Sequence, residues 1–195
     1  WLRQLGDLPA DIILDADSTD DPAHGGQQMV LFHGYYGQYM YHPLIISCNG
    51  YVILTILRPG NSHASRKIIS VLKFLVKRIR QKFPQTKIRF RADAGFSIPR
   101  LYDYLEGEDI EYAIGLITNS KLIEANEKHI EKAKQSYDKT KQKQRLFRSF
   151  LYQAGTWSKA RKVVAKAEHT KLGPNNRFVV TNSKAVGKAI YDGFY

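Results

Sequence analysis

The sequence predicts a mixed α/β fold, in which a β-sheet is covered by helices. Short runs of β-forming residues recur along the chain, and one long amphipathic segment interrupts them. Asn49-Gly50 lies between two apolar runs and is a strong signal for a two-residue hairpin turn. The chain has 195 residues, of which 43% are hydrophobic, so it can form one sizeable core.

The first half of the chain predicts several strands and one long helix. We expect strands at residues 11–18, 36–47 and 51–59, with the Asn49-Gly50 turn between the last two. Residues 63–83 predict a helix, because apolar residues recur there at helical spacing before Pro84 ends the segment. Residues 86–93 alternate between apolar and charged side chains and predict another strand.

The second half predicts further helices and strands around a lysine-rich middle. The expected elements are a short helix at 95–108, a strand at 110–117, a helix-compatible charged stretch at 120–148, β segments at 145–155, 161–170 and 176–183, and the start of a helix at 184–195. The chain begins at Trp1 and stops at Tyr195 without a cap, and we interpret both ends as those of a fragment.

The excess positive charge is concentrated in the second part. Residues 1–117 contain 13 Lys and Arg against 12 Asp and Glu, whereas residues 118–195 contain 17 against 6, and the whole chain has a net charge of +12. Such a basic region predicts a polyanionic partner, nucleic acid before anionic membrane. The alternative is a lysine-rich surface that only confers solubility.

Several classes of protein find no support in the sequence. A single cysteine, Cys48, excludes a disulfide framework and a cysteine-based zinc site, and it fits a reducing, intracellular compartment. No phosphate-binding GxxxxGK[ST] loop and no GxSxG nucleophile motif is present. No apolar stretch is long enough to span a membrane.

Two predicted strands end in aspartates, which is unexpected in a basic protein. Asp15 and Asp17 share one face of the first strand, and Asp93 follows the strand at 86–93. Carboxylates from neighbouring strands can hold Mg²⁺ or Mn²⁺, and two such ions support phosphoryl transfer. The commoner use of such aspartates, in turns and helix caps, stays open at this point.

An ordered set of motifs resembles a bacterial insertion-sequence transposase of the DDE superfamily. The motifs are "LDADSTDDPAHGGQQ", "FHGYYGQYMYHPLI", "LRPGN", "RFRADAGF", "W…ARKVVAKAEH" and "NRFVVTN", which cover the chain from about Leu14 onward. The resemblance implies an RNase H-like domain over residues 1–195, truncated at its C-terminus, with a basic α+β insertion at 120–182 after the fifth strand. It further implies two Mg²⁺ or Mn²⁺ ions, double-stranded DNA as partner, a homodimer on DNA, and a bacterial cytoplasmic location.

The resemblance also assigns roles to individual residues. Asp17, in an Asp-Ser-Thr context, matches the first catalytic aspartate, with Asp15 as the alternative metal ligand, and Asp93 matches the second. A third, glutamate ligand is expected on a helix after the insertion, where the chain stops. None of the glutamates within or before the insertion fits that place, and these are Glu124, Glu127, Glu131 and Glu168.

The basic residues expected to contact DNA lie in two places. Arg58 and Arg91 are expected near the metal ions, either on phosphate groups or paired with carboxylates. The others follow the insertion strands and are Lys159, Arg161, Lys162 and Lys166. Trp157 is a candidate for stacking on an extruded base, although a core position is the commoner use. Two other functions stay open, namely a non-catalytic nucleic-acid-binding module and a metal-dependent nuclease on the same fold.

Overall fold

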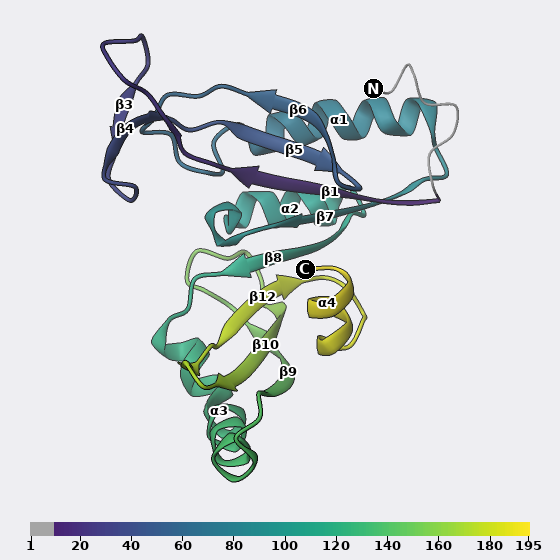
Figure 1. Cartoon of the computed structure of the whole chain (residues 1–195). Coiled ribbons are helices and arrows are strands. Elements are labelled where there is room, and N and C mark those ends of the chain that lie inside the picture. The colour runs from purple at the N-terminus through teal and green to yellow at the C-terminus, as the bar shows by residue number, and fades with distance from the viewer. Residues whose placement is uncertain (1–9) are drawn as a thin grey trace. The chain divides into compact units, whose positions relative to one another are not determined.

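The computed structural model describes residues 10–195, which form two compact units, one reaching to Ile110 and one from Glu111 to Tyr195 (Figure 1). Each unit contains both strands and helices. The predicted mixed α/β fold, a mixed sheet flanked by helices, is confirmed.

The first unit is built on a four-stranded mixed sheet with the order β6-β5-β1-β7. Its strands are β1 (Asp11–Ser18), β5 (Leu44–Cys48), β6 (Tyr51–Ile56) and β7 (Lys87–Ala92). Strands β6, β5 and β1 are antiparallel neighbours, and β7 runs parallel to β1. The helices of this unit are α1 (Ile68–Lys82), the single 3₁₀ turn η1 (Ala94–Phe96) and α2 (Pro99–Gly107).

Alternation along β1 and β7 explains how the sheet buries one face. On β1 the even-numbered residues Ile12, Leu14 and Ala16 are buried, and the odd-numbered residues are part-exposed or exposed. Strand β7 shows the same pattern, with buried Phe90 and part-exposed Arg91. The pairing register places equal parities opposite one another, so the charged residues of both strands share one face.

A small second sheet in the first unit was not expected from the sequence. The predicted strand at 36–47 is divided, because Pro43 has no N–H for a continuous ladder. Its first part, β4 (Gln38–Tyr41), pairs instead with β2 (Asp21–Pro22) and β3 (Leu31–His33). The β3–β4 hairpin can be followed in Figure 1.

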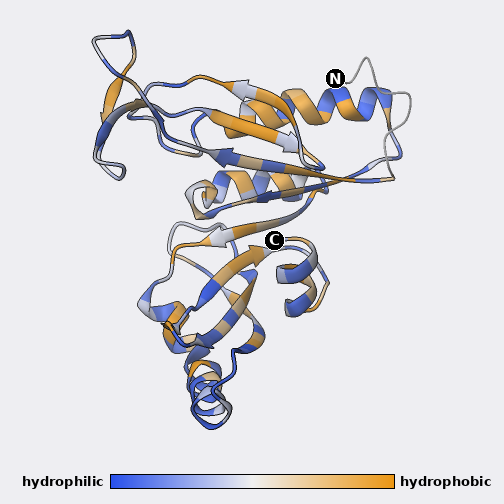
Figure 2. Cartoon of the chain, viewed as in Figure 1, coloured by the Kyte–Doolittle hydropathy of each residue, from blue (hydrophilic) through white to orange (hydrophobic). Residues whose placement is uncertain are grey.

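The second unit has an antiparallel sheet in which β10 pairs with β9, β11 and β12, and β12 also pairs with β8. Its elements are β8 (Glu111–Leu116), α3 (Ser120–Thr140), β9 (Gln144–Tyr152), β10 (Arg161–Thr170), β11 (Gly173–Pro174), β12 (Arg177–Thr181) and α4 (Gly187–Gly193). Helix α3 starts at a cap, where the Leu122 amide donates to the Asn119 side chain over 3.0 Å, and it packs on β9 and β10. The hydrophobic stretches of β10 and β12 are visible in Figure 2.

Within residues 10–195, no helix is both long and apolar enough to cross a membrane.

Candidate active site

The ends of β1 and β7 bring Asp17 and Asp93 together. The parallel register pairs Asp15 with Arg91 and Ala16 with Ala92, so the next rung of the ladder falls on Asp17 and Asp93. Asp93 then caps the turn η1, and its Oδ1 accepts a hydrogen bond of 2.8 Å from the Gly95 amide. Both carboxylates therefore lie at the carboxyl ends of adjacent parallel strands, on the charged face of the sheet.

The electrostatics of Asp93 show that this pair is not neutralised. Burial raises the pKa of Asp93, and the negative charge of Asp17 raises it further. Hydrogen bonds from the backbone amides of Gly95 and Phe96 act in the opposite direction but do not cancel the rise. A nearby cation would relieve the repulsion, because it favours the ionised form of both carboxylates.

Asp15 differs from its neighbour Asp17, because it already has a cationic partner. Arg91 contacts the Asp15 carboxylate with both Nε and Nη2, each at 2.8 Å. The sequence left two roles open for Arg91, and the structure shows the carboxylate pairing. This arrangement favours Asp17 over Asp15 as the ligand that is free for a metal ion.

Arg58 lies inside the unit and not on its surface. It is 1% exposed, and it donates hydrogen bonds to the His42 carbonyl (2.8 Å), the Ala64 carbonyl (2.7 Å) and the Ser18 hydroxyl (2.8 Å). Burial lowers its pKa to about 10, helped by the charge of Arg66, so it remains a cation at neutral pH. The expected contact of Arg58 with a DNA phosphate finds no support here, because the guanidinium is enclosed and its donors are used.

The contacts of Arg58 connect it to both aspartates through the backbone. Ser18 follows Asp17 directly, and Ala64 contacts the turn that follows Asp93. A Cβ added to Gly95 would come within 2.9 Å of the Ala64 Cβ, so this approach requires glycine. The Ala64 carbonyl and the Arg66 carbonyl, the latter at 2.9 Å, both accept hydrogen bonds from Arg58. They lie in the segment where α1 was expected to begin, and the helix starts only at Ile68.

Two further side chains border the acid pair and were not predicted as site residues. His42 is buried, and its Nδ1 lies 2.7 Å from the Ser62 carbonyl, which can only accept, so Nδ1 carries the proton. Burial lowers the pKa of His42, against the effect of that hydrogen bond, and its charge in turn affects Asp93. Burial raises the pKa of Tyr36, and the negative charges of Asp20, Asp17 and Asp93 raise it further. No sequence signal separates these two residues from the other aromatic residues of the chain.

The donor set fits a divalent cation only in part. Carboxylate oxygens are the ligands that Mg²⁺ and Mn²⁺ prefer, and Asp17 and Asp93 supply them from two adjacent strands. Within residues 10–195, however, no group of three or more His, Cys, Asp or Glu side chains is placed to hold a metal ion. The two carboxylates are therefore part of the ligand set that a metal-dependent phosphoryl-transfer site requires.

The basic residues expected on DNA in the second unit are mostly engaged within it. Arg161 is buried with its guanidinium over the Trp157 ring, at 5.7 Å from the ring centre. Lys162 donates to the carbonyls of Ser183 (3.0 Å) and Ala185 (2.7 Å). Lys159 is exposed. Trp157 itself is 7% exposed and lies in the core.

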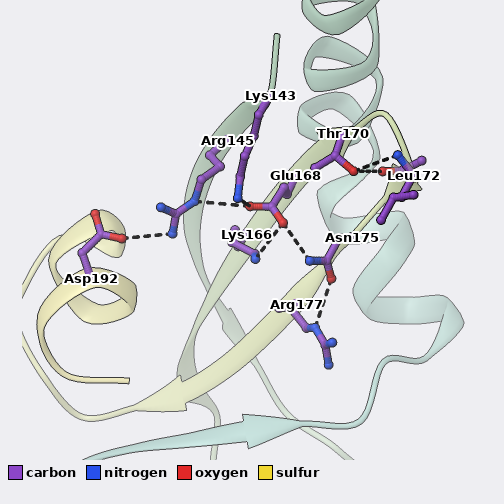
Figure 3. Close-up of polar contacts among 10 residues, drawn as sticks. Lys143, Arg145, Lys166, Glu168, Thr170, Leu172, Asn175, Arg177 and Asp192 are labelled. Carbon is purple, nitrogen blue, oxygen red and sulfur yellow. Dashed lines mark hydrogen bonds and ion pairs between the residues drawn. The ribbon is translucent and has the colours of Figure 1, made fainter.

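Lys166 belongs to a cluster around a buried carboxylate (Figure 3). Glu168 is 5% exposed, and three cations reach it, namely Lys143 at 3.0 Å, Lys166 at 3.3 Å and Arg145 at 3.5 Å. Asn175 donates a further hydrogen bond of 2.7 Å. Burial alone would raise the pKa of Glu168, but these hydrogen bonds and charges hold it below the ordinary value.

A comparison with protein families identifies the family of the chain. The family model described as transposase DDE domain group 1 matches residues 1–195, so the chain belongs to this family. The resemblance to DDE transposases is confirmed.

A solved structure gives a weaker similarity. A cryo-EM structure of a piggyBac transposase synaptic complex with hairpin DNA is similar over 89% of this chain, with 12% sequence identity and a TM-score of 0.48. The chain spans 33% of the length of that transposase. No curated protein matches the chain.

Proposed function

We propose that this chain carries the catalytic core of a DNA transposase, with Asp17 and Asp93 as ligands of Mg²⁺ or Mn²⁺. The observation that carries the proposal is the acid pair, because two carboxylates directly follow the last paired residues of two parallel strands and the charge of one raises the pKa of the other beyond the effect of burial. Bound divalent ions would activate the attacking oxygen and stabilise the leaving oxygen in phosphodiester hydrolysis and strand transfer. The chain's own contribution is to fix the two carboxylates and to place DNA against them.

We propose a positioning role for Arg58 in place of the phosphate contact. One guanidinium holds the Ser18 hydroxyl beside Asp17 and the Ala64 carbonyl beside the Asp93 turn. A rigid connection of this kind keeps two metal ligands from separate strands in a constant geometry. Arg91 has the corresponding local role at Asp15, where it leaves Asp17 as the unpaired carboxylate.

The second unit is proposed to bind the DNA backbone, and double-stranded DNA is the partner. Residues 111–195 contain 17 Lys and Arg against 7 Asp and Glu, a net charge of +10. Phosphate contacts from exposed lysines such as Lys159 give affinity that falls steeply with salt. A homodimer on DNA and a third carboxylate ligand, a glutamate outside the acid pair, complete the proposal. Glu168 is not that ligand, because its oxygens are occupied by three cations.

Mn²⁺ binding tests the metal centre directly. The affinity of the 195-residue chain for Mn²⁺, followed by electron paramagnetic resonance, should fall at least about 100-fold in Asp17→Asn and Asp93→Asn, because a direct ligand matters more than an outer partner. Asp138→Asn removes an exposed carboxylate from α3 and should change nothing. Equal affinity in all four proteins would contradict the proposed metal centre.

The products formed on DNA distinguish the remaining alternatives. A transposase core joins a 3′ end to a second duplex, a nuclease on the same fold releases only hydrolysed strands, and a binding module does neither. Gel analysis of a duplex substrate with Mn²⁺ present therefore separates the three functions. Protein bearing Asp93→Asn is the control for a contaminating nuclease.

A further inference from the structure

The β3–β4 hairpin exposes a group of aromatic rings, which we call the aromatic hairpin and define as residues 31–41. The exposed fractions are 51% for Phe32, 87% for Tyr35, 36% for Tyr36 and 63% for Tyr39. The rings contact one another edge to face, with 5.5 Å between the centres of Phe32 and Tyr39 and 5.1 Å between those of Tyr35 and Tyr36. Contiguous exposed aromatic groups of this kind mark binding surfaces more often than chance positions do.

The chemistry of the aromatic hairpin restricts what it can bind. No Asp, Glu, Lys or Arg occurs from Pro22 to Leu57, although 25% of the whole chain is charged. The surface therefore offers no cation to a phosphate and no ion pair to a protein partner. It offers the flat faces of neutral rings with polar hydroxyl ends, which suit other flat aromatic groups.

The aromatic hairpin is held firmly at its base. Met40 is fully buried, and Gly60 passes directly over the strands. A Cβ at Gly60 would lie 2.0 Å from the Met40 carbonyl oxygen and 2.3 Å from that of Leu31, so only glycine fits there. Tyr41 also forms a bridge with Pro59. The rings are consequently presented on a fixed backbone, which reduces the entropy lost on binding.

One end of the aromatic hairpin lies against the segment that follows Asp17 in the chain. Strand β2 pairs there with β4, and Gln38 Nε2 donates a hydrogen bond of 2.8 Å to Asp20 Oδ2. Burial raises the pKa of Tyr36, and the charges of Asp20, Asp17 and Asp93 raise it further. The ring of His33 continues the row from Tyr36, at 5.0 Å, to His42, at 4.8 Å. The other end carries Tyr35 outward into solvent. The row of rings thus leads away from the two carboxylates.

We propose that the aromatic hairpin stacks unpaired DNA bases next to the phosphodiester bound at Asp17 and Asp93. Every base has an aromatic face, so stacking tolerates any sequence and needs no charged side chain. Base pairing must be opened for such contact, which fits a site where strand ends are cut and transferred. The placement of DNA at the acid pair rests on the proposed function, whereas the affinity for bases does not.

The test compares the affinity of the chain for single-stranded DNA with and without bases. Fluorescence anisotropy without divalent metal is measured on a single-stranded oligonucleotide and on an abasic strand of equal length. Tyr35→Ala/Tyr39→Ala should bind the normal strand at least about 10-fold more weakly, because one stacked base contributes about 5- to 150-fold in affinity. Its affinity for the abasic strand, and the salt dependence of binding, should be unchanged.

Two variants serve as matched controls. Tyr51→Ala removes a tyrosine that is 73% exposed at the start of β6, opposite the last residue of β5, and it should bind like the wild type. Tyr35→Phe/Tyr39→Phe keeps the rings and should restore affinity. An equal loss on the abasic strand, or a normal affinity of the alanine variant, would overturn the inference.

Two further outcomes are separable. If sedimentation shows a wild-type dimer and a monomeric Tyr35→Ala/Tyr39→Ala, the surface binds a second copy of the chain and the inference is wrong. A chain that stacks bases but fails the Mn²⁺ and product tests would retain the base-binding surface and lose the proposed enzymatic function. A chain that passes the Mn²⁺ and product tests but binds the normal and the abasic strand with equal affinity would retain the proposed enzymatic function and lose the base-binding surface.

Discussion

The two units place carboxylates in opposite electrostatic surroundings. In the first unit burial and the negative charge of Asp17 raise the pKa of Asp93. In the second unit Glu168 is reached by three cations, and its pKa is lowered. Repulsion between like charges is retained where a ligand can relieve it, and it is removed where the carboxylate only supports the fold.

The contrast distinguishes charged residues that could bind a ligand from those that support the fold. Within the first unit, Asp15 and Asp17 are two residues apart on one strand face, yet only Asp15 has an arginine partner. The basic unit shows the same distinction for cations. Arg161, Lys162 and Lys166 are engaged inside the unit. Charge in the sequence is therefore a poor guide to charge that is available to a ligand.

The largest expected effect comes from Arg58→Ala, which removes the support of the acid pair. Several buried carbonyls would lose their donor, and each buried acceptor left unpaired costs about 1–3 kcal/mol, so we expect a loss of about 3–5 kcal/mol of unfolding free energy. Urea denaturation measures it. Arg66→Ala, which removes an exposed arginine nearby, is the control.

A milder variant distinguishes positioning from simple stability. Arg58→Lys keeps the charge but not the planar fork of donors, so it should fold and still bind Mn²⁺ more weakly. Normal Mn²⁺ affinity in folded Arg58→Lys would show that Arg58 supports the fold alone.

The next largest effect is expected from Glu168→Gln in the second unit. Removing the carboxylate charge leaves three cations close together, and breaking a buried ion pair costs about 3–5 kcal/mol. Because the folded pKa of Glu168 is lowered, its contribution is complete above its unfolded pKa of about 4.3 and is lost as pH falls through the folded pKa. The difference from the wild type should therefore shrink on acidification. Glu131→Gln, on the exposed face of α3, should show no such difference at any pH.

A smaller effect of opposite sign is expected from Asp93→Asn. The folded pKa of Asp93 is raised, so the ionised carboxylate destabilises the fold increasingly as pH rises through that pKa. Asparagine keeps the acceptor for the Gly95 amide and removes the repulsion, so it should stabilise the chain at pH 7 by less than about 1 kcal/mol after solvent screening. Melting temperatures at about pH 4 and pH 7 measure this, since an unperturbed Asp titrates near 3.9.

Mn²⁺ should reverse the order of the two proteins. Bound metal stabilises the wild type and not Asp93→Asn, because only the folded wild type holds the ion. A variant that is less stable than the wild type at pH 7 without metal would contradict the account of Asp93.

The local patterns made much of the fold predictable from the sequence. Apolar alternation located β1 and β7 to within a residue, and the Asn49-Gly50 turn has the positive φ angles, 48° and 88°, that its hairpin requires. Strand parity also placed Asp15 and Asp17 on one face of the first strand. These features depend only on neighbouring residues along the chain.

The features that the sequence did not reveal depend on contacts between distant segments. Arg58 was expected on a phosphate group or a carboxylate, but its partners come from residues 18, 42 and 64–66, which no local pattern brings together. The late start of α1 has the same cause, since Arg58 occupies the carbonyls before Ile68. Partners of this kind also decided which of Asp15 and Asp17 is neutralised, a choice that strand periodicity left open.

The smallest expected effect on stability concerns an ion pair that is exposed to solvent. Lys134 and Asp138 form an i,i+4 pair of 2.8 Å on α3, with 63% and 49% of their side chains exposed. Solvent screening and side-chain entropy offset most of the attraction in such a pair, so Lys134→Ala should leave the melting temperature unchanged within error. Lys143→Ala removes the same charge from the buried Glu168 and should lower it measurably. Equal effects of the two variants on the melting temperature would contradict this account, in which burial of the carboxylate determines how much an ion pair stabilises the unit.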